Sequence, residues 1–197
     1  MHVLLINGSP HEKGCTYTAL SLVAGEILNV GTKPVGGCIG CGGCAKGNGC
    51  VFGGVVNEAI EKARTADAFV FGTPVHYASA SGNMTSFLDR LAYAGGKYLA
   101  YKPAAICASA RRAGTTATLD QLAKYPEFFH MPLVSGSYWP MVHGSNPEQV
   151  LQDEEGCAVM KELGRNMAWL LQCIEAGKAA GISHPENPRR PMTNFIR

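Results

Sequence analysis

The stretch that decides the fold is residues 3–16, VLLINGSPHEKGCT. Four consecutive apolar residues, 3–6, lead directly into the turn residues 7–10 (NGSP). A short unbroken apolar run bounded by turn residues is typical of a strand buried on both faces, as in a parallel sheet. The loop then reaches a hydroxyl residue where a helical pattern begins, and free backbone N–H groups at such a junction bind anions, phosphate above all. An ordinary strand–helix connection that binds nothing explains this segment equally well.

The loop lacks the spacing of two common nucleotide-binding motifs. The residues after Gly8, SPHEKG, do not meet the GxxxxGK[ST] spacing of the ATP-hydrolysing P-loop. Pro10 also stands where the dinucleotide-binding pattern GxGxxG requires glycine. The sequence therefore argues against ATP hydrolysis and against that class of dinucleotide site.

Composition places the chain among globular proteins. Its 197 residues are expected to form a single domain, and 46% of them are hydrophobic. A net charge of +2 is too small to indicate nucleic acid as a partner. No apolar run approaches the eighteen residues of a membrane span, and no signal peptide is recognised, so we expect a cytoplasmic protein. Thiols stay reduced there, and the eight cysteines are interpreted as metal ligands, redox groups or core residues.

Apolar spacing along the rest of the chain predicts alternating helices and strands. The expected helices are 16–29, 55–66, 84–93, 118–125 and a long one from Pro147, and the expected strands after the first are 32–35, 68–72, 104–108 and 131–137. This order predicts an α/β sandwich with a mostly parallel five-stranded sheet whose second strand is short or missing. In the helix 84–93, the adjacent Asp89 and Arg90 are interpreted as a solvated or helix-anchoring pair.

A cysteine-rich loop, 36–54, interrupts this pattern. Its thiols are Cys38, Cys41, Cys44 and Cys50, a C-x2-C-x2-C-x5-C array with five glycines between residues 40 and 49. Such glycine density lets the backbone wrap closely around a group. Four thiolates at this spacing can hold a [4Fe–4S] cluster, whereas zinc sites usually present two separated pairs. Reduced thiols in a glycine-rich loop remain the alternative.

The strands 68–72 and 104–108 end in loops at the same sheet edge as residues 7–16. In doubly wound sheets, ligands bind beyond the carboxyl ends of the strands, where the strand order reverses. Arg111 and Arg112 follow the strand 104–108 and would face a phosphate or a flavin carbonyl there, unless they are simply solvated.

With these loops placed, the chain resembles the flavodoxin-like NAD(P)H-dependent FMN reductase family, and within it the iron–sulfur flavoprotein branch. The resemblance covers nearly the whole chain. INGSPHEKGCT is similar to the family's phosphate loop, and GTPVHYASASGNMTSFLDR is similar to its flavin segment. The compact cysteine array and the closing TNFIR also fit. Cys15 stands where the family has Asn, His76 where Tyr is usual and Thr85 where Lys is usual.

The resemblance implies a flavodoxin-like three-layer sandwich with FMN at the carboxyl edge of the sheet and NAD(P)H as reductant. The implied FMN-binding residues are Ser9, Pro10, Gly14, Cys15 and Thr16 at the phosphate, Pro74, Val75, His76 and Tyr77 along the ring, and Ser109, Ala110, Arg111 and Arg112 on its other side. No side chain is expected to be essential for hydride transfer. We interpret His76 as a packing residue, although an imidazole near a flavin can also donate a proton.

Three functions remain open from the sequence. The first is an FMN-dependent NAD(P)H oxidoreductase acting on quinones, nitro compounds or free flavin. The second is an electron-transfer iron–sulfur flavoprotein with a small-molecule or protein electron acceptor. The third is a cofactor-free binding module on the same scaffold. A proline-rich tail, 182–197, is expected to be extended, with Phe195 and Ile196 packing on the body or on a partner in a homodimer or homotetramer.

Overall fold

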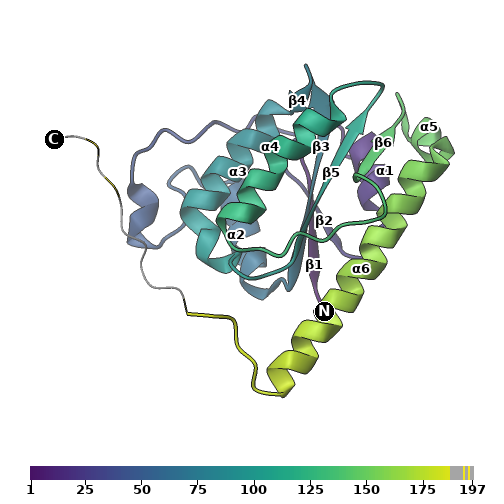
Figure 1. Cartoon of the computed structure of the whole chain (residues 1–197). Helices are drawn as coiled ribbons and strands as arrows, with labels where there is room; N and C mark the ends of the chain where they lie inside the picture. The colour runs from purple at the N-terminus through teal and green to yellow at the C-terminus, as the bar shows by residue number, and fades with distance from the viewer. Residues whose placement is uncertain (187–192, 194, 196–197) are drawn as a thin grey trace.

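A computed structural model describes residues 1–186, 193 and 195 of the chain. Its centre is a parallel sheet in the order β2-β1-β3-β5-β6 (Figure 1). These strands are β1 (Val3–Asn7), β2 (Glu26–Asn29), β3 (Ala68–His76), β5 (Ala104–Ala110) and β6 (Met141–His143). A two-residue strand, β4 (Ser79–Ala80), pairs antiparallel with the end of β3. The predicted parallel sheet of five strands is confirmed, with β4 as an addition.

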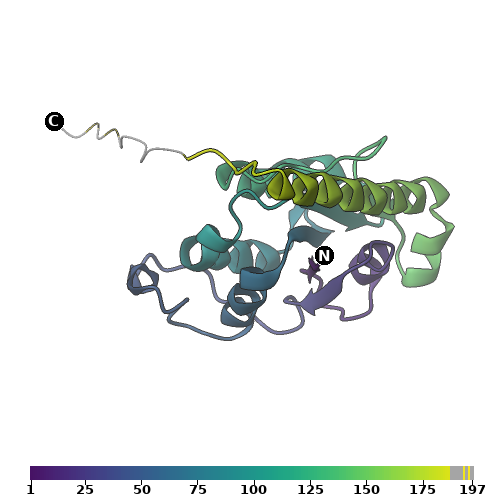
Figure 2. The same cartoon turned by 90° about the horizontal axis from the view of Figure 1, so that it is seen from below.

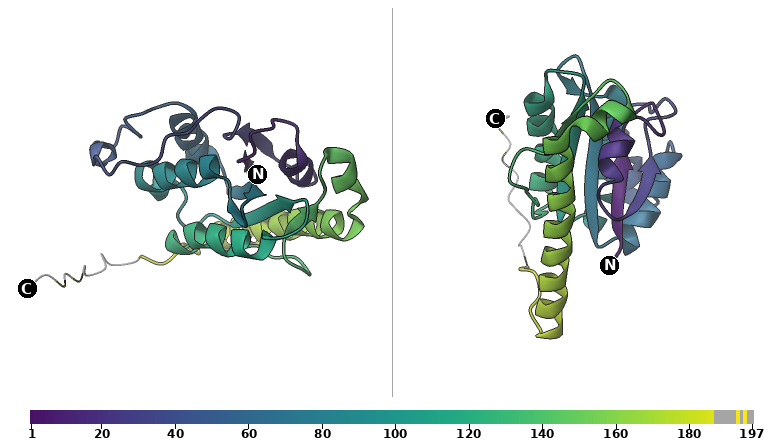
Figure 3. Two further views of the ribbon diagram at one scale, coloured as in Figure 1. Left: turned by 90° about the horizontal axis from the view of Figure 1, so that it is seen from above. Right: turned by 90° about the vertical axis from the view of Figure 1, so that its right-hand side faces the viewer.

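Helices cover both faces of the sheet, which gives the three predicted layers (Figures 2 and 3). One face carries α2 (Val55–Thr65), α3 (Gly82–Gly95) and α4 (Thr115–Phe128), and the other carries α1 (Cys15–Leu20), α5 (Pro147–Gln152) and α6 (Glu154–Ala179). Two 3-10 turns, η1 (Gly43–Lys46) and η2 (Gly96–Tyr98), complete the elements. Along β1, Leu4 and Ile6 enter one core while Leu5 enters the other, because neighbouring strand residues point to opposite faces.

The second strand lies earlier in the chain than predicted. The helix expected over 16–29 ends at Leu20, and Glu26–Asn29 forms β2, whereas 32–35 is not a strand. Ile27 pairs with Leu5 of β1, so its burial comes from a sheet ladder rather than from a helix face. The strand is short, with four residues, as expected for an edge.

Two predictions in the last third of the chain were also wrong. The fifth strand is β6 and not 131–137, of which only Leu133 forms a bridge to the sheet. The long helix predicted from Pro147 is interrupted at Asp153. Asp153 ends α5 and caps α6, since its Oδ1 accepts from the Gly156 backbone N–H at 3.0 Å. Its Oδ2 accepts from the His143 backbone N–H at 2.7 Å, which ties this break to β6.

The predicted tail lies mostly outside the described residues. Residues 182–186 form neither helix nor strand, and Ile196 is not among the described residues. Phe195 is 90% exposed, so of the two predicted alternatives it does not pack on the body of this chain, and packing on a partner stays a prediction. Within the described part, no helix combines the length and apolar character needed to span a membrane.

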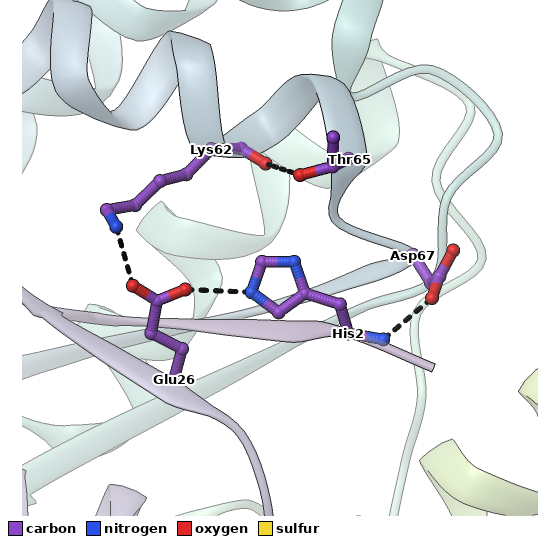
Figure 4. A network of polar contacts seen from close by, with 5 residues as sticks. All are labelled: His2, Glu26, Lys62, Thr65 and Asp67. Atoms are coloured by element: carbon purple, nitrogen blue, oxygen red, sulfur yellow. Dashed lines mark hydrogen bonds and ion pairs between the residues drawn. The ribbon is translucent and has the colours of Figure 1, made fainter.

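A polar network at the amino ends of the strands holds the edge strand β2 in place (Figure 4). Glu26 accepts hydrogen bonds from Lys62 of α2 at 2.6 Å and contacts the His2 ring at 2.9 Å. The His2 backbone N–H donates to Asp67 at 2.7 Å. The hydrogen bonds from Lys62 and His2 lower the pKa of the Glu26 carboxyl.

Candidate functional site

The sheet register brings the three predicted loops to one edge. Asn7, the last residue of β1, pairs with Gly72 of β3. Two residues further along, Pro74 of β3 pairs with Ser109 of β5. The segments that follow β1, β3 and β5 therefore leave the sheet side by side, as the sequence predicted. The order reverses between β1 and β3, which is where ligands bind in sheets of this type.

Two buried side chains shape the first loop from inside. The Asn7 amide oxygen accepts from the Ser9 backbone N–H at 3.1 Å, and its nitrogen donates to the Glu12 carbonyl at 3.2 Å. The Ser9 hydroxyl accepts from the His11 backbone N–H at 3.1 Å. Sequence reasoning named Ser9 as a site residue and did not name Asn7. The available signal for Asn7 was a polar side chain directly at the end of an apolar strand.

A buried hydroxyl pair joins the first loop to the end of β5. Thr16 and Ser109 share a hydrogen bond of 2.8 Å, and each side chain is almost completely buried. The residues are 93 positions apart in the sequence, so this contact is a direct bridge between two predicted site segments. Cys15 lies beside them, its thiol facing the Gly144 carbonyl at 3.6 Å. Burial raises the pKa of the Cys15 thiol, which keeps it protonated and unreactive near neutral pH.

The end of β3 turns back on itself in a tight hairpin. Tyr77 and Ala78 form its two-residue turn, with backbone φ angles of 51° and 59°. Hairpin turns of this kind strongly favour Asn-Gly, because side chains are strained in the left-handed region. Gln121 of α4 holds the turn by accepting hydrogen bonds from the Ser79 hydroxyl and the Ala80 backbone N–H. His76 and Tyr77 are both exposed, so the interpretation of His76 as a packing residue was wrong.

The loop after β5 touches this hairpin. Gly114 has a φ of 93°, and a methyl group there would lie 2.6 Å from the Ala78 Cα and 2.9 Å from a Val75 methyl. The space between the two segments therefore admits no side chain. Arg111 and Arg112 belong to this loop and are exposed, as sequence reasoning allowed.

The start of α3 completes the edge and leads away from it. The Ser81 hydroxyl donates to the Gly8 carbonyl at 2.9 Å and accepts from the Met84 backbone N–H at 3.3 Å, which caps the helix. The Asn83 amide accepts from the Val35 backbone N–H at 3.2 Å. The residue just before the cysteine-rich loop, 36–54, is therefore hydrogen-bonded to α3, and the N-cap of the same helix contacts the loop after β1.

The four predicted cysteines line a single cavity of about 210 Å³. The loop containing them is the slate-blue segment with a short helical turn at the left of Figure 1. Its other lining residues include Phe52 and, from α3, Arg90 and Tyr93. Six glycines between residues 40 and 54 have positive φ, which explains the glycine density of the segment. The sequence thus identified a real concentration of thiols.

The donor set of this cavity consists of four thiols. Among the described residues, no three His, Cys, Asp or Glu side chains are gathered closely enough to hold one metal ion. A tetrahedral zinc site with Zn–S bonds of about 2.3 Å would need its sulfurs within roughly 4 Å of one another. A [4Fe–4S] cluster lies between four thiolates, and Cys38, Cys41, Cys44 and Cys50, which line one cavity, are a donor set of that kind.

Arg90 was not recognised as a residue of this cavity. It is only 6% exposed, and its Nε lies 3.2 Å from the Cys50 Sγ. Asp89 does not pair with it, because the Asp89 carboxylate instead accepts a hydrogen bond from the Tyr125 hydroxyl at 2.6 Å. Arg90 thus anchors the helix to the loop and is not solvated. The sequence signal was its position between the buried residues Phe87 and Leu91, at the border of the apolar face.

Known proteins share both the sequence pattern and the fold. Residues 1–146 match the family described as NADPH-dependent FMN reductase. An iron-sulfur flavoprotein from Methanocaldococcus jannaschii is 26% identical over 89% of this chain and 100% of its own. An iron-sulfur flavoprotein from Archaeoglobus fulgidus is 28% identical over 82% and 86%. The solved structure of a flavodoxin, WrbA-like protein from Agrobacterium tumefaciens superposes with a TM-score of 0.62 and 16% identity, over 87% and 97% of the two chains.

The match covers all three loops of the carboxyl edge, the cysteine cavity and Arg90. The structural similarity confirms the flavodoxin-like sandwich that the sequence predicted. The chain belongs to the NADPH-dependent FMN reductase family and is an FMN-dependent oxidoreductase.

Proposed function

We propose that this chain binds FMN between the three loops of the carboxyl edge and reduces quinones, nitro compounds or free flavin with electrons from NAD(P)H. The observation that carries the proposal is the physical joining of these loops. Thr16 bonds to Ser109, and Gly114 packs against Ala78, so the segments after β1, β3 and β5 form one continuous surface.

The first loop is suited to the phosphate of FMN. Asn7 and Ser9 use their side chains to fold the loop, and the Gly14 backbone N–H donates to the His11 carbonyl at 3.3 Å, which leaves the backbone N–H groups of Cys15 and Thr16 as donors for a phosphate. The Thr16 hydroxyl is held by Ser109 and can share its hydrogen bond with a phosphate oxygen. Cys15, which replaces the family's asparagine, offers only its backbone N–H, because its thiol faces Gly144.

The two later loops are suited to the ring. Pro74 and Val75 leave the sheet half-buried, and the exposed His76 and Tyr77 extend beyond them at the hairpin. Ser109, Ala110, Arg111 and Arg112 face this hairpin from β5, and the arginines are free to approach the carbonyl oxygens of a flavin. Bound in this way, FMN would supply the chemistry of hydride acceptance from a reduced nicotinamide and of electron transfer to an acceptor. His76 can hold a proton at this surface.

FMN titration of the purified chain tests the proposal. Binding should quench FMN fluorescence with one FMN per chain, and NAD(P)H oxidation should then depend on added quinone or flavin. The variant T16V should weaken FMN binding. The control is T85V, which removes a hydroxyl that donates only to the Gly82 carbonyl. Absence of FMN uptake would support a cofactor-free binding module and would end this proposal.

A second candidate function is electron transfer between FMN and a [4Fe–4S] cluster. The cavity lined by the four cysteines supports it, and so do the relatives that are named iron-sulfur flavoproteins. Anaerobically prepared protein should then contain about four irons and four acid-labile sulfides per chain. FMN without iron would instead leave the cysteine loop as a structural feature and favour the nicotinamide-driven reductase.

We also propose a cytoplasmic homodimer or homotetramer. Exposed aromatic side chains on neighbouring helices support association: Tyr93 of α3 is 74% exposed and Phe128 of α4 is 61% exposed. Both line a groove of about 630 Å³ between these helices. Light scattering should give a mass of two or four chains, and the double variant Y93E/F128E should reduce it to one.

A further inference from the structure

Arg90 is a buried cation without a carboxylate partner. Its side chain is 6% exposed, and in the described part of the chain no Asp or Glu oxygen lies within ion-pair distance of it. A guanidinium keeps its charge at every physiological pH. Burying such a charge without a counter-charge is unfavourable, because it loses its hydration. Two backbone carbonyls and the Phe52 ring, whose centroid lies 5.4 Å from the guanidinium carbon, contact Arg90, and none of them carries a full negative charge.

The contacts of Arg90 indicate where a negative group belongs. Nη2 donates to the Gly53 carbonyl at 3.0 Å and Nη1 to the Gly36 carbonyl at 3.3 Å, at the two ends of the cysteine-rich loop. The third nitrogen, Nε, donates toward the Cys50 Sγ, 3.2 Å away. Two nitrogens thus hold the loop, and the third donates to a thiol of the cavity.

Cys50 is held from a second side by α2. Its backbone N–H donates to the Asn57 amide oxygen at 2.8 Å, and its carbonyl accepts from the Asn57 nitrogen at 3.1 Å. Asn57 is neutral and holds the Cys50 backbone, whereas Arg90 is positively charged and donates to the Cys50 sulfur. Asn57 therefore controls where the Cys50 backbone lies, and Arg90 controls the electrostatic potential at the Cys50 sulfur.

We propose that Arg90 is the counter-charge and N–H donor of a Cys50 thiolate that ligates a [4Fe–4S] cluster, and that it sets the reduction potential of that cluster. This inference rests on the second candidate function. Thiolate ligation supplies the negative charge that the buried guanidinium lacks. Reduction adds one more electron to this negative group, and a nearby positive charge and an N–H···S hydrogen bond favour the reduced form. Removing the charge should therefore shift the potential to more negative values.

Arg90 is a positioning residue placed between the two sites. Its helix, α3, begins at the Ser81 cap on the carboxyl edge, and eight residues of helix between Gly82 and Arg90 span about 12 Å. Arg90 therefore links the sulfur ligand to a rigid element that contacts the loop after β1. The helix α3 thus connects the residue proposed to set the reduction potential of the cluster with the loop proposed to bind the flavin phosphate.

Redox titration of the anaerobic holoprotein, followed by the electron paramagnetic resonance of the reduced cluster, tests this inference. The variants are R90K, which keeps the charge, R90Q, which keeps N–H donors without charge, and N57A, which loosens the Cys50 backbone only. The potential of R90Q should be more negative than that of the wild type, that of R90K should lie closer to the wild type, and that of N57A should be unchanged.

Iron and sulfide content is measured on the same samples. A cluster that is full in R90K and missing in R90Q would also support the counter-charge, whereas clusters missing from both arginine variants would overturn it, since R90K keeps the positive charge. Equal potentials in R90Q and wild type would overturn the inference, and so would loss of the cluster in all three variants, since loop position alone would then control it. Wild-type protein without iron would overturn the second candidate function and this inference with it, while leaving the FMN reductase proposal standing.

Discussion

The contact between Gly114 and the β3–β4 hairpin provides the sharpest test of the proposed flavin site. Replacing Gly114 by alanine places a methyl group 2.6 Å from the Ala78 Cα and 2.9 Å from a Val75 methyl, at a φ of 93°. The left-handed backbone costs about 1–2 kcal/mol for a residue with a side chain. The overlap adds about 1–3 kcal/mol, as in other overpacked positions.

The two contributions are expected to appear in different measurements. The backbone cost is present in every state of the folded protein and lowers its stability. The overlap can be relieved if the loop 109–114 moves away from the hairpin, and FMN binding must then bring the loop back. An overlap of about 1–3 kcal/mol corresponds to a rise of about 5- to 150-fold in the Kd of FMN.

A matched control separates these contributions. Gly181 also has a positive φ, 80°, but a methyl group there meets no atom within 4 Å, and it lies after α6, away from the carboxyl edge. G181A should therefore lose only the backbone contribution and keep the FMN affinity of the wild type. FMN fluorescence titration and urea unfolding measure both quantities. An unchanged FMN affinity in G114A would refute the idea that these two loops jointly enclose the flavin.

Three further predictions concern the hydroxyl bridge, the polar network at the opposite edge and the cysteines. T16V and S109A should each lower the free energy of unfolding in urea by about 1–3 kcal/mol, because each leaves a buried hydroxyl unpaired, and the double variant should lose less than the sum. Since hydrogen bonds lower the pKa of Glu26, it stabilises the fold above its unfolded pKa of about 4.3 and loses this effect as the pH falls through its folded pKa. The Tm difference between wild type and E26Q should therefore be present at pH 6 and decrease steadily as the pH is lowered below 4.3, and a difference independent of pH would contradict this assignment. Burial raises the pKa of Cys107 to about 12, so iodoacetamide at pH 8 should modify the exposed Cys173 in the native protein and leave Cys107 unmodified until unfolding.

The central strands and their loops could be predicted from the sequence because their signals are local. A parallel strand covered on both faces must be apolar at every position, and the runs in β1, β3 and β5 have this property. The turn residues at their ends identified the carboxyl edge before any contact was known. The four cysteines were equally visible, since ligand spacing within thirteen residues is a property of the chain itself.

The edge strands could not be predicted in the same way. In Glu26–Asn29 the apolar residues Ile27 and Leu28 continue the helical spacing of the segment before them, and only pairing with β1 selects a strand. The three residues of β6 are too few to produce a recognisable pattern. Short edge strands obtain their conformation from the neighbouring strand, so their position depends on a ladder that the local sequence does not describe.

The sequence by itself determined the segments that form the sheet's central strands, the three loops at its carboxyl edge and the four thiols of the cysteine-rich loop. Only the tertiary structure decided that Thr16 meets Ser109, that Gly114 meets Ala78 and that Arg90 meets Cys50. Each of these contacts joins residues at least 36 positions apart, as between Ala78 and Gly114. Such contacts depend on how helices pack on the sheet. Arg90 shows the reason most clearly: as one charged residue beside Asp89 it is indistinguishable from a solvated arginine, and its burial follows from where α3 places it against a loop forty residues earlier.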